Sequence, residues 1–264
     1  MKGSLFAGDT YTTPPGKEKL LHKLLMRWRA YYILRVAAVV FGYWPIARKG
    51  GLDQQNWHNA AFDIFKALED CGGRFHITGL DNLRKIDGPV VFVANHMSTL
   101  ETLVPPAFMY PYKKPVYVVK EQLLTVPFFG AYVQKCIGVT RNHPAEDFKQ
   151  VMLRGADKIS QGYSIIIFPQ ATRSMTFDPA KFNSLGVKLA KRCKVPVIPV
   201  AFKTDFWGTG RLVKDFGPLS PDKTIFIDCG EPIEIHGTGK EEHEQIMTFI
   251  KERLAGWSRS AATA

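Results

Sequence analysis

The sequence predicts an α/β protein in which a mixed, largely parallel central sheet is flanked by helices. Short β-branched segments alternate along the chain with amphipathic segments of helical period, and breakers such as Gly88-Pro89 separate them. This alternation is typical of sheets whose parallel strands are joined by crossover helices. An apolar, aromatic segment precedes this region and predicts an N-terminal membrane-associated helical hairpin.

Composition and charge narrow the class of partner. The chain of 264 residues can form one large α/β domain or two small ones, and no repeat or linker divides it. The 35 Lys and Arg against 24 Asp and Glu give a net charge of +11, which indicates an anionic partner: nucleic acid, a phosphorylated metabolite or an acidic membrane. Four widely spaced cysteines without a C-x-x-C pair favour unpaired thiols in a reducing compartment and argue against a zinc site.

The N-terminal region divides into three parts. Residues 1–16 are polar and are expected to form a flexible tail. Residues 17–29 place leucines and Trp28 at helical spacing among basic residues, as in a helix lying on an anionic bilayer. Residues 30–47 are apolar except mainly for Arg35 and Pro45, which makes them marginal as a transmembrane helix. We expect residues 17–50 to form membrane-associated helices that dip into one leaflet; packing on the domain core is the alternative.

Residues 51–264 are expected to form the α/β domain, and its elements follow in chain order. Helical periodicity and end signals predict helices over 52–71, 101–110, 145–161, 185–192 and 241–257, with another starting at 127–130. Apolar β-branched runs predict strands over 74–78, 90–94, 115–119, 136–140, 164–168, 196–202 and 225–228.

His96 is the first candidate for chemistry. The strand over 90–94 stops at Asn95-His96, and Ser98 and Glu101 form an S-x-x-E capping box, so His96 is expected in a strand-to-helix loop. Histidine can act there as a base if a carboxylate orients it, and Glu101 is the nearest candidate. Because five residues turn a helix through roughly 500°, the pair can meet only if His96 precedes the first turn. A structural histidine beside a glutamate that only caps the helix is the alternative.

Basic residues follow three other predicted strands. Lys120, Arg141 and Arg173 each lie where a strand is expected to end. The carboxyl ends of parallel strands share one edge of a sheet, so these side chains are expected to converge with His96. Arginine offers a planar fork and lysine a point charge, and both suit a phosphate. The residues by themselves therefore predict a phosphate-handling α/β enzyme with a histidine base.

Four blocks between roughly residues 75 and 202 carry a more specific signal. They are Asn95-His96-Met97-Ser98-Thr99-Leu100-Glu101; Lys120-Glu121-Gln122-Leu123 with Pro127-Phe128-Phe129-Gly130 and Gly138-Val139-Thr140-Arg141; Phe168-Pro169-Gln170-Ala171-Thr172-Arg173-Ser174; and Val195-Pro196-Val197-Ile198-Pro199-Val200. In order and spacing they resemble the motifs of the 1-acylglycerol-3-phosphate acyltransferase family of glycerolipid acyltransferases. The chain departs from the usual pattern at Glu101, Gln170 and Ala171, where the family has Asp, Glu and Gly.

The resemblance implies transfer of a fatty acyl group from acyl-CoA or acyl carrier protein to the free hydroxyl of a lysophospholipid. The expected acceptor is 1-acylglycerol-3-phosphate, and the product is phosphatidic acid. His96 would be the general base and Glu101 would orient it. The substrate-binding residues implied are Lys120, Arg141, Phe168, Pro169, Gln170, Ala171, Thr172 and Arg173.

The same resemblance implies an enzyme of phospholipid biosynthesis associated with anionic membrane lipids. Its expected location is the cytoplasmic face of the inner or plasma membrane. No metal and no cofactor beyond the thioester co-substrate is expected, and no nucleic-acid motif is present. A thioesterase and a non-catalytic lipid-binding protein on the same scaffold are the alternatives.

Overall fold

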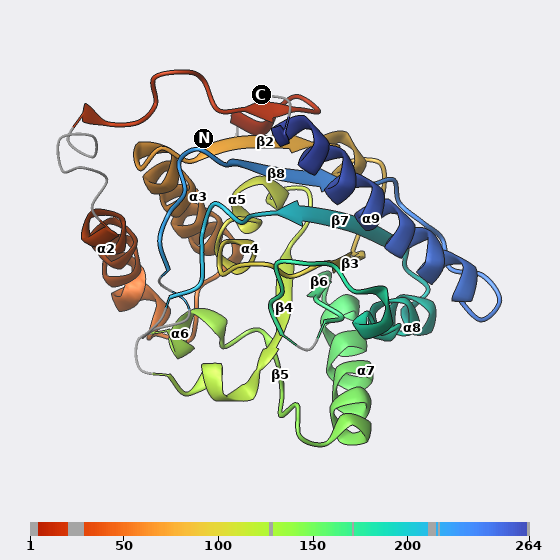
Figure 1. The fold of residues 1–264 in the computed structure, drawn as a ribbon. Helices are drawn as coiled ribbons and strands as arrows, with labels where there is room; N and C mark the ends of the chain where they lie inside the picture. Colours follow the sequence, from red (N-terminus) through yellow and green to blue (C-terminus); the bar gives the residue numbers. More distant parts are fainter. Residues whose placement is uncertain are drawn as a thin grey trace.

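A computed structural model describes residues 5–20, 29–126, 129–170, 172–210, 215 and 217–262 (Figure 1). Within these residues lies an eight-stranded sheet of order β1-β2-β8-β7-β3-β6-β4-β5. Its strands are β1 (Tyr11–Thr12), β2 (Arg74–Thr78), β3 (Val91–Ala94), β4 (Pro115–Lys120), β5 (Ile137–Val139), β6 (Ser164–Ile167), β7 (Val197–Lys203) and β8 (Thr224–Cys229).

The sheet is mixed and largely parallel, as the sequence predicts. Strands β7, β3, β6, β4 and β5 all run in one direction, because each adjacent pair among them is parallel. Strand β8 is antiparallel to β7 and parallel to β2, and β1 is antiparallel to β2. The carboxyl ends of β3, β4, β5, β6 and β7 therefore meet at one edge of the sheet, which we call the catalytic edge.

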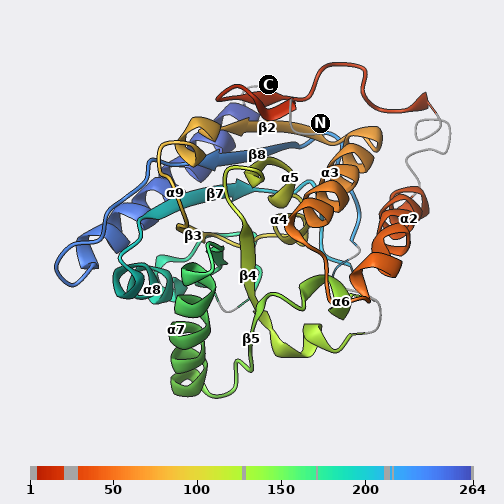
Figure 2. The same cartoon turned by 180° about the vertical axis from the view of Figure 1, so that it is seen from behind.

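Helices cover both faces of the sheet (Figures 1 and 2). The face that Figure 2 shows in front carries α3 (Gln54–Asp70), α4 (Leu100–Leu103) and α5 (Pro106–Met109), whereas α8 (Leu185–Cys193) and α9 (Lys240–Ala262) cover the other. Helix α7 (Pro144–Ser160) packs on α8 and β5, and the short α6 (Gly130–Val133) follows the 3₁₀ turn η3 (Glu121–Leu124).

The single helix expected after Glu101 is wrong in one respect: it is broken into α4 and α5. Residues 105 and 106 are both prolines, and Pro106 opens the second helix. Proline has no N–H to donate to the preceding turn, and its ring clashes with the carbonyl four residues back, so one continuous helix is excluded. The break leaves α4 as a single turn that carries Glu101 next to the catalytic edge.

Strand β3 is held rigidly where it leads into the catalytic edge. All four of its residues are essentially inaccessible to solvent. Helix α8 approaches β3 closely because residue 186 is glycine: a Cβ at Gly186 would lie 2.4 Å from Cγ2 of Val93. An alanine there would force the helix away from the strand that positions His96.

Residues 5–16 are not the flexible tail that the sequence led us to expect. Phe6 and Tyr11 are 3% and 6% exposed, and their rings pack edge-on against Phe65 of α3 at 5.3 and 5.5 Å. The Tyr11 hydroxyl donates to buried Glu69 at 2.5 Å, and Tyr11–Thr12 pairs with β2. The expectation failed because two aromatic side chains in a polar stretch complete the core beneath α3.

Helix α2 (Arg29–Ala47) packs on the domain with one face and exposes the other. Tyr32 and Val36 are buried, whereas Leu34 and Phe41 are 65% and 57% exposed. Arg35 of α2 forms an ion pair with Asp70 of α3, with 2.5 Å between Nη2 and Oδ2. Residues 30–47 are apolar and long enough to cross a membrane by length and composition, and 17% of them are buried. The predicted basic helix over 17–29 lies largely outside the described residues, because 21–28 are not described.

Candidate active site

His96 and Glu101 form a hydrogen-bonded pair at the catalytic edge. Nδ1 of His96 lies 2.5 Å from Oε2 of Glu101, and the two side chains are 13% and 0% exposed. His96 lies in the loop between β3 and α4, before the first helical turn, which is the condition that the five-residue spacing imposed. A carboxylate can only accept, so Nδ1 carries the proton and the lone pair of Nε2 is left for chemistry.

The carboxylate of Glu101 is held from several sides. It accepts hydrogen bonds from the N–H groups of Met97 and Ser98, each at 2.9 Å, and from the hydroxyl of Thr204 just beyond β7. The capping and catalytic interpretations of Glu101 are therefore not exclusive, because one carboxylate closes the start of α4 and also orients the imidazole. Such a fixed partner is what a histidine base needs to keep one tautomer and one orientation.

Two side chains fix the backbone of the loop over residues 95–99, which we call the His96 loop. The Asn95 amide donates to the carbonyl of Phe202 and accepts from its N–H, both at 2.8 Å, and this joins the loop to β7. The Gln170 amide oxygen accepts from the N–H of His96 at 2.9 Å. On one face of the imidazole lies the ring of Phe168, stacked at 4.2 Å with an interplanar angle of 16°.

Arg173 lies next to the His96 loop, as predicted. Its guanidinium donates to the hydroxyl of Thr99 and forms an ion pair of 2.8 Å with Asp215, and its side chain is 27% exposed. The N–H of Ser174 donates to the carbonyl of His96 at 2.9 Å, which keeps the segment after β6 against the loop. A cation therefore lies beside the proposed base.

Arg141 and Lys120 follow the two strands beyond β6. Arg141 has a φ of 66°, a conformation that a non-glycine residue rarely adopts, and Asp147 stabilises it by accepting its N–H at 2.7 Å. Although Arg141 lies at the surface, partial desolvation and the positive charge of Arg173 lower its pKa, while Asp147 acts in the opposite direction. Lys120 is half-buried at the end of β4. We call Lys120, Arg141 and Arg173 the basic rim.

The other predicted substrate-binding residues lie in different environments. Pro169 and Gln170 are buried, and the carbonyl of Pro169 accepts from the Asn183 amide at 2.6 Å. Gln170 supports His96 through its amide oxygen, and its predicted contact with substrate stays a prediction. Thr172 is exposed, and Ala171 lies outside the described residues.

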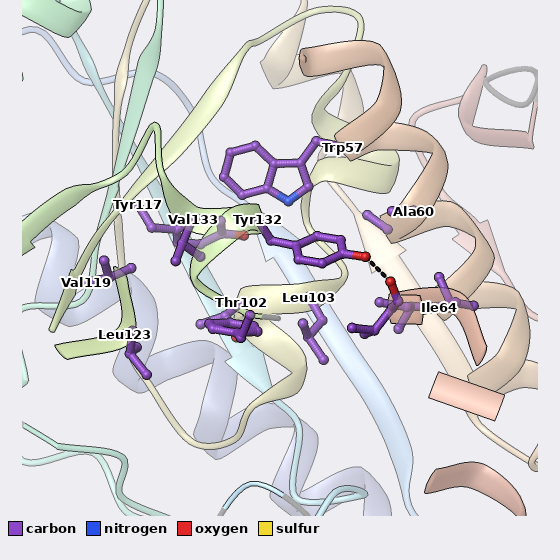
Figure 3. A pocket seen from close by; sticks show the side chains of 14 residues that line it. Trp57, Ala60, Ile64, Thr102, Leu103, Tyr117, Val119, Leu123, Tyr132 and Val133 are labelled. Carbon is purple, nitrogen blue, oxygen red and sulfur yellow. Dashed lines mark hydrogen bonds between the residues drawn. The ribbon is translucent and has the colours of Figure 1, made fainter. Parts of the chain in front are cut away.

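An apolar pocket opens beside α4, on the α3 face of the sheet (Figure 3). Thr102 and Leu103, the residues after Glu101, form one wall, and the Tyr132 hydroxyl donates to the carbonyl of Val40 at another (Figure 3). Its lining also includes Val39, Trp57, Ala60, Ala61, Ile64, Tyr117, Val119, Leu123, Phe129 and Val133. Helices α2 and α3, strand β4 and α6 thus enclose an apolar space that reaches the helix of Glu101.

Sequence reasoning missed Thr204 and Asp215. Each lies more than a hundred residues from its partner, Glu101 and Thr99 respectively, and neither belongs to a local pattern. Thr204 follows directly after the predicted strand over 196–202 and Lys203. Convergence of β7 with the other strands at the catalytic edge is the only signal that pointed to it.

Comparison with known proteins agrees with this geometry. The Acyltransferase family model matches residues 74–203, which contain the His96 loop and the basic rim. A 1-acyl-sn-glycerol-3-phosphate acyltransferase of Pseudomonas aeruginosa is 28% identical over 240 residues, covering 85% of this chain and 88% of that protein. A protein of the same name from Borreliella burgdorferi is 23% identical over 193 residues, 70% of this chain and 71% of its own.

A solved structure shares the fold. The crystal structure of the 1-acyl-sn-glycerophosphate acyltransferase PlsC from Thermotoga maritima superimposes with a TM-score of 0.63 at 19% identity, covering 90% of this chain and 97% of that one. The fold and the matched region define an α/β acyltransferase. The chain belongs to the acyltransferase family of phospholipid biosynthesis and is an enzyme of that family.

Proposed function

We propose that this enzyme transfers a fatty acyl group from a thioester of coenzyme A or acyl carrier protein to the free hydroxyl of 1-acylglycerol-3-phosphate, giving phosphatidic acid. The observation that carries the proposal is the His96–Glu101 pair at 2.5 Å, fixed at the catalytic edge next to Arg173. The Pseudomonas aeruginosa relative, whose name states this acceptor, matches over most of both chains and supports the choice.

His96 is the general base of the proposed reaction. Its Nε2 takes the proton of the acceptor hydroxyl while that oxygen attacks the thioester carbonyl carbon, and Glu101 stabilises the imidazolium that forms. When the tetrahedral intermediate collapses, the C–S bond breaks and the imidazolium returns the proton to the departing thiolate. No acyl group becomes attached to the protein.

The basic rim holds the phosphate of the acceptor in this proposal. Arg173 is close to the His96 loop through Thr99, and a bidentate guanidinium contact fixes both the position and the angle of a phosphate. Lys120 and Arg141 add positive charge from the neighbouring strands. Asp215 holds Arg173 in the free enzyme, so the incoming phosphate exchanges one anionic partner for another.

The apolar pocket next to α4 receives the acyl chain of the donor in the same proposal. It is lined almost entirely by aliphatic and aromatic side chains and begins one residue after Glu101. Burial of a chain there contributes free energy in proportion to the apolar area removed from water. The exposed face of α2, with Leu34 and Phe41, contacts the membrane that supplies the lipid substrates, on its cytoplasmic face.

Thiol release in detergent tests the proposal. Purified enzyme is mixed with acyl-CoA or acyl carrier protein thioester and a panel of lysophospholipids, and wild type is compared with His96→Ala. We expect release that requires a lysophospholipid, is fastest with 1-acylglycerol-3-phosphate and falls about a thousandfold in the variant, within the range of general-base contributions. Phosphatidic acid is identified by mass spectrometry.

The alternatives give different results in the same assay. Release without any lysophospholipid, at an equal rate, identifies a thioesterase and overturns acyl transfer. No release with either donor, together with unchanged lysolipid binding in His96→Ala, identifies a lipid-binding protein. Preference for another headgroup keeps acyl transfer but replaces the proposed acceptor.

A further inference from the structure

An open cleft of about 540 Å³ lies on the α9 side of the catalytic edge. This volume is within the range of about 300–1,000 Å³ that small-molecule sites occupy. Met97, Phe177 and Leu254 supply apolar surface, and three lysines surround them: Lys203, Lys223 and Lys251. We call this space the lysine cleft. None of its lysines belongs to the basic rim.

The lysine cleft carries an excess of positive charge. Lys203 and Lys223 share one carboxylate, that of Asp205, at 3.2 and 3.0 Å. Burial favours protonation of Asp205, but its contacts with the two lysines outweigh this and lower its pKa, so the carboxylate stays ionised. Lys251 forms no ion pair with any described residue. Three cations therefore face one anion in the lining, which is an arrangement that attracts a polyanion.

The cleft adjoins the reacting groups through β7. The N–H of Phe202 donates a hydrogen bond to Asn95, and the hydroxyl of Thr204 donates one to Glu101. Lys203 lies between Phe202 and Thr204 in the chain. Successive side chains of a strand point to opposite faces, so Lys203 faces α9 while Thr204 reaches the Glu101 side. Met97, which follows His96 in the chain, is part of the cleft lining.

We propose that the lysine cleft binds the phosphate groups of coenzyme A in the acyl donor. The inference rests on the proposed acyl-transfer function and extends it to the donor. An acyl-CoA has an apolar chain at one end, phosphates at the other and the thioester between them. The apolar pocket on the α3 side and the lysine cleft on the α9 side lie on either side of His96, which matches this order of groups. Phe177 and Leu254 provide apolar surface for the adenine.

Binding of desulfo-CoA, which cannot react, tests the site without turnover. Isothermal titration of the full-length enzyme in detergent compares wild type with Lys251→Glu, and Lys191→Glu on the exposed surface of α8 is the matched control. We expect the Kd to rise about tenfold in Lys251→Glu and to stay unchanged in the control, because Lys251 lines the cleft and Lys191 does not. The wild-type Kd should also rise with salt. An unchanged Kd in Lys251→Glu, or no binding to wild type, overturns the proposal.

Kinetics separate this site from the rest of the enzyme. Acyl-CoA is compared with an acyl thioester of N-acetylcysteamine, which has the same reacting group but no phosphate. Lys251→Glu should raise KM for acyl-CoA by the same factor and leave kcat and the KM values of the truncated donor and the lysolipid unchanged. Equal effects on both donors overturn the assignment. Activity with acyl carrier protein, without any binding of desulfo-CoA, also overturns the coenzyme A site, while the acyl-transfer function stands. If acyl transfer fails but desulfo-CoA still binds in a Lys251-dependent way, the coenzyme A site stands and the proposed reaction is overturned.

Discussion

The His96 loop and the basic rim lie at one edge of the same sheet, yet they are built differently. Glu101 is completely buried and accepts from backbone, imidazole and hydroxyl donors, so the position of the proposed base is fixed before substrate arrives. Arg173 is partly exposed and is paired with Asp215, a carboxylate that is 51% exposed. The reacting group is thus preorganised, whereas the group proposed to bind phosphate is held by an exposed ion pair that an incoming anion can replace. This agrees with the general need for rigid positioning at the reacting atoms.

Glu101→Gln alters the preorganised partner of His96 and should have the largest effect on activity. The amide keeps the shape but removes the charge that stabilises the imidazolium, and its NH₂ group faces hydrogen-bond donors. We expect kcat to fall about a hundredfold or more, with a small change in lysolipid KM. Steady-state thiol release measures both.

Glu69→Gln is the matched control for this change. Glu69 is equally buried and also accepts from a hydroxyl, that of Tyr11, but its hydrogen-bond partners Tyr11, Thr13 and Lys66 lie outside the His96 loop. It should lower thermal stability and leave kcat near wild type. If Glu69→Gln reduced kcat as strongly as Glu101→Gln, the loss would be one of folding and the catalytic pair would be excluded.

Arg173→Ala alters the basic rim and should have the second-largest effect on activity. Loss of the guanidinium removes a charge-assisted contact to phosphate, so we expect the KM for lysophosphatidic acid to rise about tenfold to thirtyfold, with kcat changed much less. Arg154→Ala, at an exposed position of α7, is the control. A KM that is unchanged for phosphate-bearing acceptors would remove Arg173 from acceptor binding.

The sequence predicted the parts of this site that local patterns encode. Apolar β-branched runs located nearly all strands to within a residue or two, and the ends of these runs placed His96, Lys120 and Arg173 after strands. Sheet direction then brought these residues to one edge. Hydrophobic periodicity did not reveal that Pro105 and Pro106 divide the helix after Glu101, although proline chemistry contains that information.

The remaining parts depend on contacts that are remote in sequence. Thr204 contacts Glu101 across 103 positions, and Asp215 contacts Thr99 across 116. A lone threonine or aspartate carries no periodic signal, so only the three-dimensional arrangement identifies these partners. The same reason explains why the sequence did not predict the packing of residues 5–16. Phe6 and Tyr11 lie in a polar stretch, and their burial against α3 is a contact remote in sequence.

Thr204→Val tests how Glu101 is held beside the His96 loop. It removes one hydrogen-bond donor to Glu101 and keeps the shape of the side chain. The hydroxyl of Thr204 also accepts from Ser98 at 2.9 Å, so its loss leaves a buried polar group without its partner. We expect kcat to fall about fivefold with no change in either KM, and Thr204→Ser should restore most of the loss. Equal kcat in Thr204→Val and wild type would show that the backbone donors alone hold the carboxylate.

Asp215→Asn tests whether Arg173 of the basic rim exchanges its partner. Its effect on activity should be the smallest, and it should lower a KM where the other variants impair the enzyme. In the free enzyme the Asp215 carboxylate competes with substrate phosphate for Arg173. An exposed ion pair contributes little, about 0–1 kcal/mol, so relieving the competition should lower the KM for lysophosphatidic acid about twofold to threefold and leave kcat unchanged. The double variant with Arg173→Ala should lose this gain, because the gain depends on the guanidinium. A higher KM in Asp215→Asn would instead mean that the carboxylate holds Arg173 in the geometry that binds phosphate, and the rim would then be as preorganised as the His96 loop.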